Sequence, residues 1–75
     1  MTLTDLKINE SAIVTKVGGD PLLRQRLLEM GITPFTKVML KSFAPLGDPL
    51  ELLLRGYVLS LSLKEAEKIT VERVS

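Results

Sequence analysis

This chain of 75 residues lacks the reactive side chains on which several common kinds of catalysis depend. The chain contains no His and no Cys, so it offers neither an imidazole base nor a thiol nucleophile. Ser and Thr hydroxyls are present, but without His they cannot form a catalytic triad, and no Ser-x-x-Lys motif occurs. Glu65 and Glu67 are two residues apart, so their carboxylates diverge on a helix. We therefore expect a non-enzymatic protein with no catalytic residues and no cofactor.

The nine carboxylates are the remaining candidates for holding a metal ion. Ferrous iron is usually bound by imidazole, carboxylate or thiolate groups, and the sequence supplies only the second of these. No acidic pair within a predicted helix has the i, i+3 or i, i+4 spacing of a helical metal site. Asp48 and Glu51 could approach each other near a loop, but two carboxylates beside water would bind Fe²⁺ weakly and unselectively. We predict no specific metal site.

Composition limits the class of partner and the compartment. Ten Lys and Arg against nine Asp and Glu give a net charge of +1. We expect no nucleic-acid binding, because a balanced chain without a basic stripe releases few counterions. The apolar runs are far shorter than the ~20 residues that span a bilayer, which argues against direct membrane insertion. No secretory signal pattern opens the chain, and the lack of Cys fits a reducing cytosol. We expect one cytoplasmic domain over residues 1–75.

One early helix is predicted after a first strand. Residues 11–17 are rich in β-branched side chains and end at a Gly-Gly pair, which is typical of a strand and a turn. Asp20 supplies an N-cap, Pro21 suits the first helical position, and Gly31 suits the C′ position. The stripe expected to be buried consists of Leu23, Leu27 and Met30. At 100° per residue, Leu22 and Leu28 lie off this stripe.

After the helix the hydrophobic period changes to two, which predicts strands. In residues 37–43, Met39 points to the side opposite Val38 and Leu40. Residues 49–63 are predicted to contain two strands joined by a two-residue turn at Arg55-Gly56. The resulting register pairs Leu54 with Tyr57, Leu52 with Leu59 and Leu50 with Leu61 on one face, and Leu53 with Val58 and Glu51 with Ser60 on the other.

The end of the chain completes a mainly β fold. Residues 64–68 predict one helical turn with Ala66 inward, and residues 69–74 predict a final strand. About five short strands with one early helix favour a small antiparallel β-barrel. We expect closure of this barrel to remove the free sheet edges.

Several motifs follow one another along nearly the whole chain. They are the helix end LLEMGI, then TP, the loop APLGDP, the hairpin LRGYVLSL and the segment EAEKITVE. In this order they resemble the FeoA family, small cytosolic proteins of bacterial ferrous-iron transport. The resemblance implies an SH3-like barrel, related to the carboxy-terminal domain of iron-dependent repressors. It also implies association with FeoB, the membrane GTPase that carries the iron, and so a place at the inner face of the cytoplasmic membrane through that partner.

One position departs from the family pattern. Where the family usually has Gly after the proline of the strand-entry turn, this chain has Phe35. If the turn keeps a positive φ, Phe35 is strained by about 1–2 kcal/mol. An exposed aromatic side chain in a loop offers a large apolar area, and we predict that Phe35 contacts a partner.

The loop APLGDP, residues 44–49, is predicted to be first of all a turn. Pro45 fixes φ, Gly47 permits a left-handed conformation, and Asp48 can accept a turn hydrogen bond. A phosphate cradle is not expected, because the two prolines lack N–H groups and a strand follows. A docking role for the loop, which would present Leu46, stays open.

The candidate partner contacts share an outward position. Met39, Leu53 and Val58 have the outward parity of neighbouring strands and predict an apolar patch, unless the early helix or a chain terminus covers it. The full set is Leu28, Phe35, Met39, Leu46, Leu53 and Val58.

The working hypothesis is an accessory protein that binds or regulates a FeoB-type transporter. The alternatives are a regulatory domain like that of the iron-dependent repressors and a self-assembling adaptor, so homo-oligomerisation stays open. With one Tyr, two Phe and no Trp, an aromatic groove for proline-rich peptides is not expected.

Overall fold

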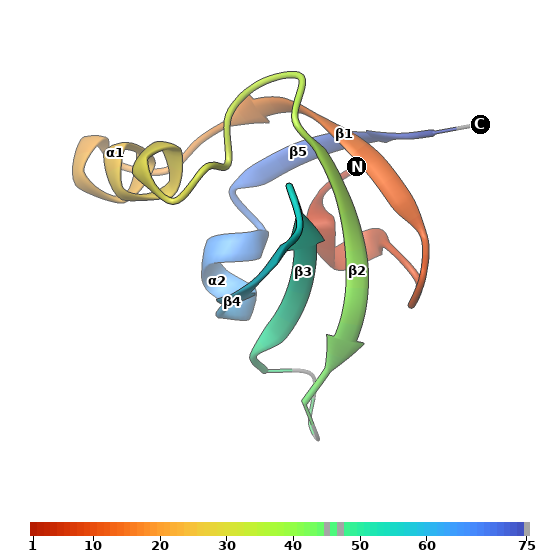
Figure 1. Cartoon of the computed structure of the whole chain (residues 1–75). Helices are drawn as coiled ribbons and strands as arrows, with labels where there is room; N and C mark the ends of the chain where they lie inside the picture. Colours follow the sequence, from red (N-terminus) through yellow and green to blue (C-terminus); the bar gives the residue numbers. More distant parts are fainter. Residues whose placement is uncertain (45, 47, 75) are drawn as a thin grey trace.

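A strongly bent antiparallel sheet organises the chain. A computed structural model describes residues 1–44, 46 and 48–74. Within these residues, five strands lie side by side in the order β4-β3-β2-β1-β5 (Figure 1). In chain order the elements are η1 (Leu3–Asp5), β1 (Ser11–Val17), α1 (Pro21–Glu29), β2 (Lys37–Phe43), β3 (Leu50–Leu54), β4 (Tyr57–Leu61), α2 (Leu63–Ala66) and β5 (Ile69–Arg73).

The helix α1 begins where the sequence predicts. The Asp20 carboxylate accepts a hydrogen bond from the Leu23 N–H at 2.9 Å, and Pro21 occupies the first turn. Leu27 is fully buried, whereas Leu23 and Met30 are partly buried against the core. Figure 1 shows this helix at one end of the bent sheet, between β1 and β2.

The β3–β4 hairpin has the register predicted from its two-residue turn. Arg55 and Gly56 both have positive φ, at 48° and 83°, as a type I′ turn requires. The pairing is continuous from the turn to the far end of both strands. The inward residues Leu50, Leu52, Leu54 and Leu61 are at most 2% exposed. The short helix α2 and the inward Ala66 are also as predicted.

The amino-terminal segment contributes to the core in a way that the sequence analysis missed. Leu3, the first residue of η1, and Leu6, its C-cap, are both buried. The Met1 carbonyl accepts a hydrogen bond from the Val71 N–H at 2.8 Å, and Thr2 forms a bridge with Thr70. A single short turn has no hydrophobic period to detect, so only the tertiary fold reveals its role.

The predicted mainly β fold is confirmed, but the ladder of hydrogen bonds does not close. In the described part of the chain, β4 and β5 are the two ends of the sheet and do not pair with each other. The expectation that barrel closure removes both edges is therefore wrong. The amino-terminal bridge covers the edge at β5, whereas the edge at β4 has no such cover among the described residues.

The two helices are tied together by one carboxylate. Glu65 accepts hydrogen bonds from the Ser62 N–H, closing a capping box at the start of α2, and forms an ion pair with Arg26 of α1. The Ser62 backbone N–H, and to a smaller extent the Arg26 guanidinium, hold the pKa of Glu65 below its usual range despite partial burial. Glu65 therefore stabilises the fold in its ionised form.

Glu65→Gln should lower the free energy of unfolding by about 0.5–1 kcal/mol at pH 7, because the charge-assisted contacts are lost. The folded-state pKa lies below the ordinary value of 4.5, so this contribution is present above that value and is lost as the pH falls through the folded pKa. Urea unfolding from pH 7 to pH 3 should show the two proteins converging. The control is the exposed Glu67→Gln, and a constant gap across this range would contradict the assignment.

Gly31 and Tyr57 fix the junction between α1 and the hairpin. The Tyr57 hydroxyl donates to the Met30 carbonyl at 2.5 Å. Gly31 has φ +99°, and a Cβ placed there would collide with this hydroxyl. The position therefore needs Gly both for its backbone conformation and for the space that Tyr57 occupies.

Gly31→Ala should cost roughly 3 kcal/mol, as the sum of backbone strain and the steric conflict with Tyr57. Gly56→Ala is the matched control, since φ there is +83° but no atom lies within 4 Å of the added Cβ. It should cost only about 1 kcal/mol. Adding Tyr57→Phe should recover part of the Gly31→Ala loss in denaturant titrations. Equal costs at the two glycines would refute the steric argument.

Candidate partner-binding site

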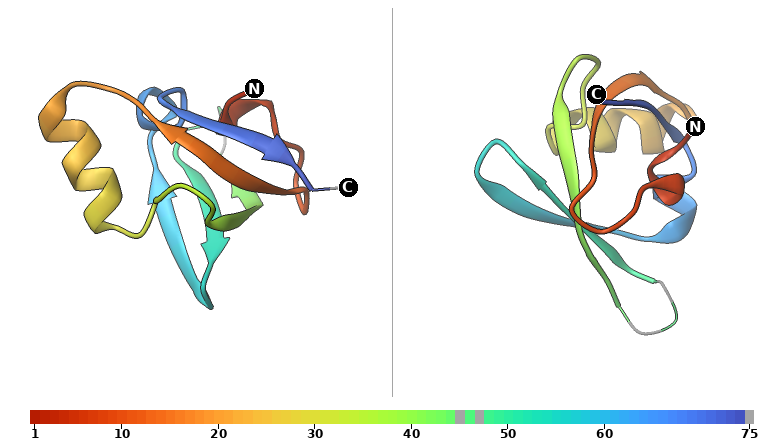
Figure 2. Two further views of the ribbon diagram at one scale, coloured as in Figure 1. Left: turned by 90° about the horizontal axis from the view of Figure 1, so that it is seen from above. Right: turned by 90° about the vertical axis from the view of Figure 1, so that its right-hand side faces the viewer.

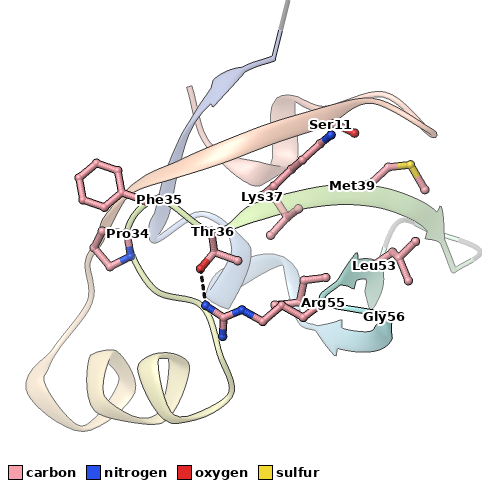
Figure 3. Close-up of a pocket in the computed structure, with 11 residues that line it drawn as sticks. Ser11, Pro34, Phe35, Thr36, Lys37, Met39, Leu53, Arg55 and Gly56 are labelled. Atoms are coloured by element: carbon pink, nitrogen blue, oxygen red, sulfur yellow. Dashed lines mark hydrogen bonds between the residues drawn. The ribbon is translucent and has the colours of Figure 1, made fainter.

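An open groove of about 660 Å³ lies on the outward side of the sheet. It is lined by Ser11 of β1, residues 34–36 of the turn before β2, residues 37–39 of β2 and residues 53–56 of the β3–β4 hairpin. Figure 3 shows these segments around the groove. The groove therefore lies where two turns and three strands meet.

Three neighbouring apolar side chains form a row, called the apolar row, across the outward side of the sheet. Met39 is paired with Leu53, and Leu53 is paired with Val58, so the three lie side by side on β2, β3 and β4. Met39 and Leu53 are half-buried, and Val58 is 42% exposed. The alternative that a helix or terminus covers the row is not what the structure shows, since Met39 and Leu53 line the open groove.

Phe35 stands at one end of the groove in a strained backbone conformation. Its φ is +72°, and its side chain is 86% exposed. The Thr36 N–H donates to the Thr33 carbonyl at 3.1 Å, and the Phe35 N–H donates to the Val14 carbonyl at 2.7 Å. These bonds hold a turn whose third position favours Gly. Figure 3 shows the ring pointing away from Met39 and Leu53.

The opposite wall of the groove carries a fixed positive charge. The Arg55 guanidinium donates to the hydroxyl of Thr36 at 3.1 Å (Figure 3). It also donates to the hydroxyl of Thr33 at 3.3 Å. Exposed Lys37 also lines the groove, and none of the lining residues is acidic. The groove therefore combines apolar contacts with a positive rim, which suits an apolar segment that carries a carboxylate.

Leu46 is separate from this groove. It is fully exposed, with φ +74°, in the loop between β2 and β3, at the end of β2 remote from the Phe35 turn (Figure 1). The roles predicted for Pro45 and Gly47 concern positions outside the described residues. Asp48 accepts a hydrogen bond from the Leu63 N–H at 3.2 Å, so it connects the loop to α2 rather than closing the turn.

Leu28 packs partly against the core, so the prediction that it lies clear of the buried face is wrong. Among the leucines of that helix, only Leu22 is strongly exposed, at 82%. The helix sits at the end of a curved sheet, which covers a wider arc of the helix surface than the predicted stripe. Most of the Leu28 surface is therefore unavailable for the contact role that its helical position suggested.

The carboxylates predicted to lie near the loop are engaged separately. Asp48 faces α2, whereas Glu51 accepts a hydrogen bond from the Ser42 hydroxyl at 2.7 Å. Among the described residues, no group of three or more His, Cys, Asp or Glu side chains is arranged to hold a metal ion. Nor does any helix in this part of the chain have the length and apolar character needed to cross a membrane.

The sequence analysis missed Arg55 and Thr36 as members of the site. Arg55 was expected only as a turn residue, and its reach to the Thr36 hydroxyl depends on how the hairpin folds against the turn before β2. No local pattern signals this contact, since 19 positions separate the two residues in the chain.

Residues 1–73 match the family model of the FeoA domain. This chain belongs to the FeoA domain family. A fusion of Fe(2+) transport protein A with the Fe(2+) transporter FeoB from Porphyromonas gingivalis is 35% identical over all 75 residues. The chain spans 9% of the length of that protein.

Solved structures of FeoA proteins have the same fold. The solution structure of FeoA from Chlorobium tepidum is 40% identical, with a TM-score of 0.92 over the whole chain and 71% of the relative. FeoA from Stenotrophomonas maltophilia, described as a prokaryotic SH3 domain protein and solved in complex with zinc, is 28% identical, with a TM-score of 0.84 over 96% of this chain and 89% of that one. The SH3-like fold predicted from the sequence is confirmed.

A manganese-dependent transcriptional repressor also contains this fold, with a TM-score of 0.91 over 99% of this chain and 36% of that protein. The two are only 14% identical. This likeness supports a common architecture and carries no argument about function.

Phe35→Gly should raise the free energy of unfolding by about 1 kcal/mol. The substitution removes the strain of a positive φ at a non-glycine residue, and little buried apolar area is lost because the ring is exposed. The greater backbone entropy of Gly in the unfolded chain offsets part of this gain. Phe35→Ala is the control, because it removes the ring but keeps the strain, and it should leave stability nearly unchanged. Urea denaturation measures both, and a loss of stability in Phe35→Gly would show that the ring stabilises the native fold.

Proposed function

We propose that this protein is a non-enzymatic accessory module of bacterial ferrous-iron uptake. In this proposal it binds a FeoB-type membrane GTPase transporter at the cytoplasmic face of the membrane. The observation that carries the proposal is the Porphyromonas gingivalis relative, in which a segment similar to this whole chain is joined to the transporter FeoB. Covalent fusion gives each domain a high effective concentration near the other, which favours a functional contact between them.

The apolar row and the positive rim of the groove are the proposed contact surface. Met39, Leu53 and Val58 form a continuous apolar strip on a rigid sheet, so docking against them costs little conformational entropy. Arg55 is held in place by two threonine hydroxyls before any partner arrives. Phe35 adds an aromatic side chain at the end of the groove, and aromatic and Arg side chains are enriched at binding hot spots.

The strain at Phe35 supports a contact role for that side chain. Phe35 has a positive φ, which is unfavourable for a bulky residue, and its exposed ring contributes little buried area to the core. Backbone strain of this kind tends to occur at functional positions. The proposal assigns Phe35 to the partner surface, whereas Leu46 lies too far along the β2–β3 loop to share the same contact.

Replacing Leu53 and Val58 together by Lys and Thr should weaken binding to the transporter at least tenfold. Both side chains point away from the core, so the free energy of unfolding should fall by no more than about 1 kcal/mol. Thr15→Lys, an exposed change on β1, is the control and should bind normally. The measurement is biolayer interferometry against the purified FeoB-type transporter from the same genome.

Two outcomes would count against the proposal. Wild-type affinity in a folded double variant would exclude the groove as the contact surface. Failure of the wild-type protein to bind the transporter at all would reject the functional proposal itself. Binding to a purified metal-dependent repressor instead would favour the regulatory alternative.

A further inference from the structure

The outer edge of β4 presents unpaired backbone groups. The two-residue turn makes Leu54 and Tyr57 a hydrogen-bonded pair, so the N–H and C=O groups of alternate β4 residues point toward β3. Those of the intervening residues, Val58 and Ser60, point away from the sheet. Outside the strand ladders, no backbone hydrogen bond among the described residues involves Val58 or Ser60, and the hairpin register leaves their N–H and C=O groups out of the ladder with β3. Both residues are exposed.

The two edges of the sheet differ in their protection. Natural sheets usually blunt an edge with Pro, Lys, a bulge or a covering segment. At β5 the amino-terminal residues provide the cover, and the pairing of β5 with β1 contains an irregularity. β4 pairs with β3 without a register shift and has no Pro, Lys or other charged residue in Tyr57–Leu61. Figure 2 shows the hairpin extending from the rest of the sheet, and no other strand among the described residues pairs with the outer side of β4.

We propose that a second copy of this chain pairs with β4, so that two β4 strands run antiparallel about a two-fold axis at Leu59. In this register Val58 lies opposite Ser60 of the second copy, and Ser60 lies opposite its Val58. Each of these pairs exchanges two backbone hydrogen bonds, so the four N–H and C=O groups on each edge are all satisfied. The strand is thus complementary to itself.

The side chains of β4 permit this arrangement. The strand is uncharged, so two copies bring no like charges together, whereas two edges bearing Lys or Glu would repel. Leu59 is only partly buried in the single chain and would meet Leu59 of the second copy on the inner side of the sheet. On the outer side, Val58 of each copy brings its apolar row to the two-fold axis, so the strip becomes nearly continuous across the dimer.

This surface shares Val58 with the proposed transporter contact, whereas Ser60 belongs to the self-pairing edge alone. Ser60 does not line the groove, so it tests self-association without altering the residues assigned to transporter binding. Because four backbone hydrogen bonds and a few side chains make a small interface, the dissociation constant of the dimer should be on the order of 100 μM.

The test is amide hydrogen exchange of the full chain, followed by NMR from 20 μM to 2 mM. The amides of Val58 and Ser60 should gain about fivefold protection over this range, because a dissociation constant near 100 μM lowers the monomer fraction from roughly three quarters to roughly one seventh. Those of Leu59 and Leu61, which already bond to β3, should change little beyond any general stabilisation. Sedimentation equilibrium over the same range should show a monomer–dimer equilibrium. A monomer at 2 mM would overturn the proposal, as would a dimer in which the Val58 and Ser60 amides stay unprotected.

Ser60→Lys should raise the dissociation constant of the dimer at least tenfold, because the two new ammonium groups lie diagonally across the axis. Within one chain the same Lys faces Glu51 across the hairpin, which favours the fold. Ser60→Thr keeps an uncharged edge and should dimerise normally, and Thr15→Lys controls for the added charge. Normal dimerisation of Ser60→Lys would place the contact elsewhere, while binding of the transporter by this variant reports separately on the proposed function.

Discussion

The two-residue turn at Arg55-Gly56 is the constraint on which much of this structure depends. A type I′ turn allows only one register for the strands on either side, and a slip of one residue would exchange their two faces. The register buries Leu52 and its inward neighbours, and it leaves Leu53 and Val58 outward. The groove, the apolar row and the free edge of β4 all follow from this single local geometry.

Backbone strain is concentrated beside the proposed contact surface. Phe35 and Arg55, two of the residues with positive φ that are not Gly, line the same groove. The Phe35 turn is held by bonds to Thr33 and Val14, while Arg55 is anchored by threonine hydroxyls of that turn. Each turn therefore helps to position the other, and the surface between them is formed before a partner binds.

Membership of the FeoA family and the surface geometry support the same kind of function. The sequence contains no His and no Cys, and the groove combines apolar side chains with fixed cations. A fusion of a related segment to FeoB in Porphyromonas gingivalis is consistent with a role in contact rather than in reaction. The groove and the β4 edge are adjacent, and the two proposed contacts meet at Val58, whereas Arg55 and Ser60 each belong to one of them.

The sequence by itself determined the local elements, because the signals for them are local. The cap at Asp20, the glycine at Gly31 and the alternation around the hairpin turn predict the helix, its end and the strand register, and the structure confirms them. Only the tertiary structure decided how far the sheet closes, how Leu3 of the amino-terminal turn enters the core, and how Arg55 meets the turn before β2. These features join segments far apart in the chain, and their geometry depends on the curvature of the whole sheet, which no short pattern of residues encodes.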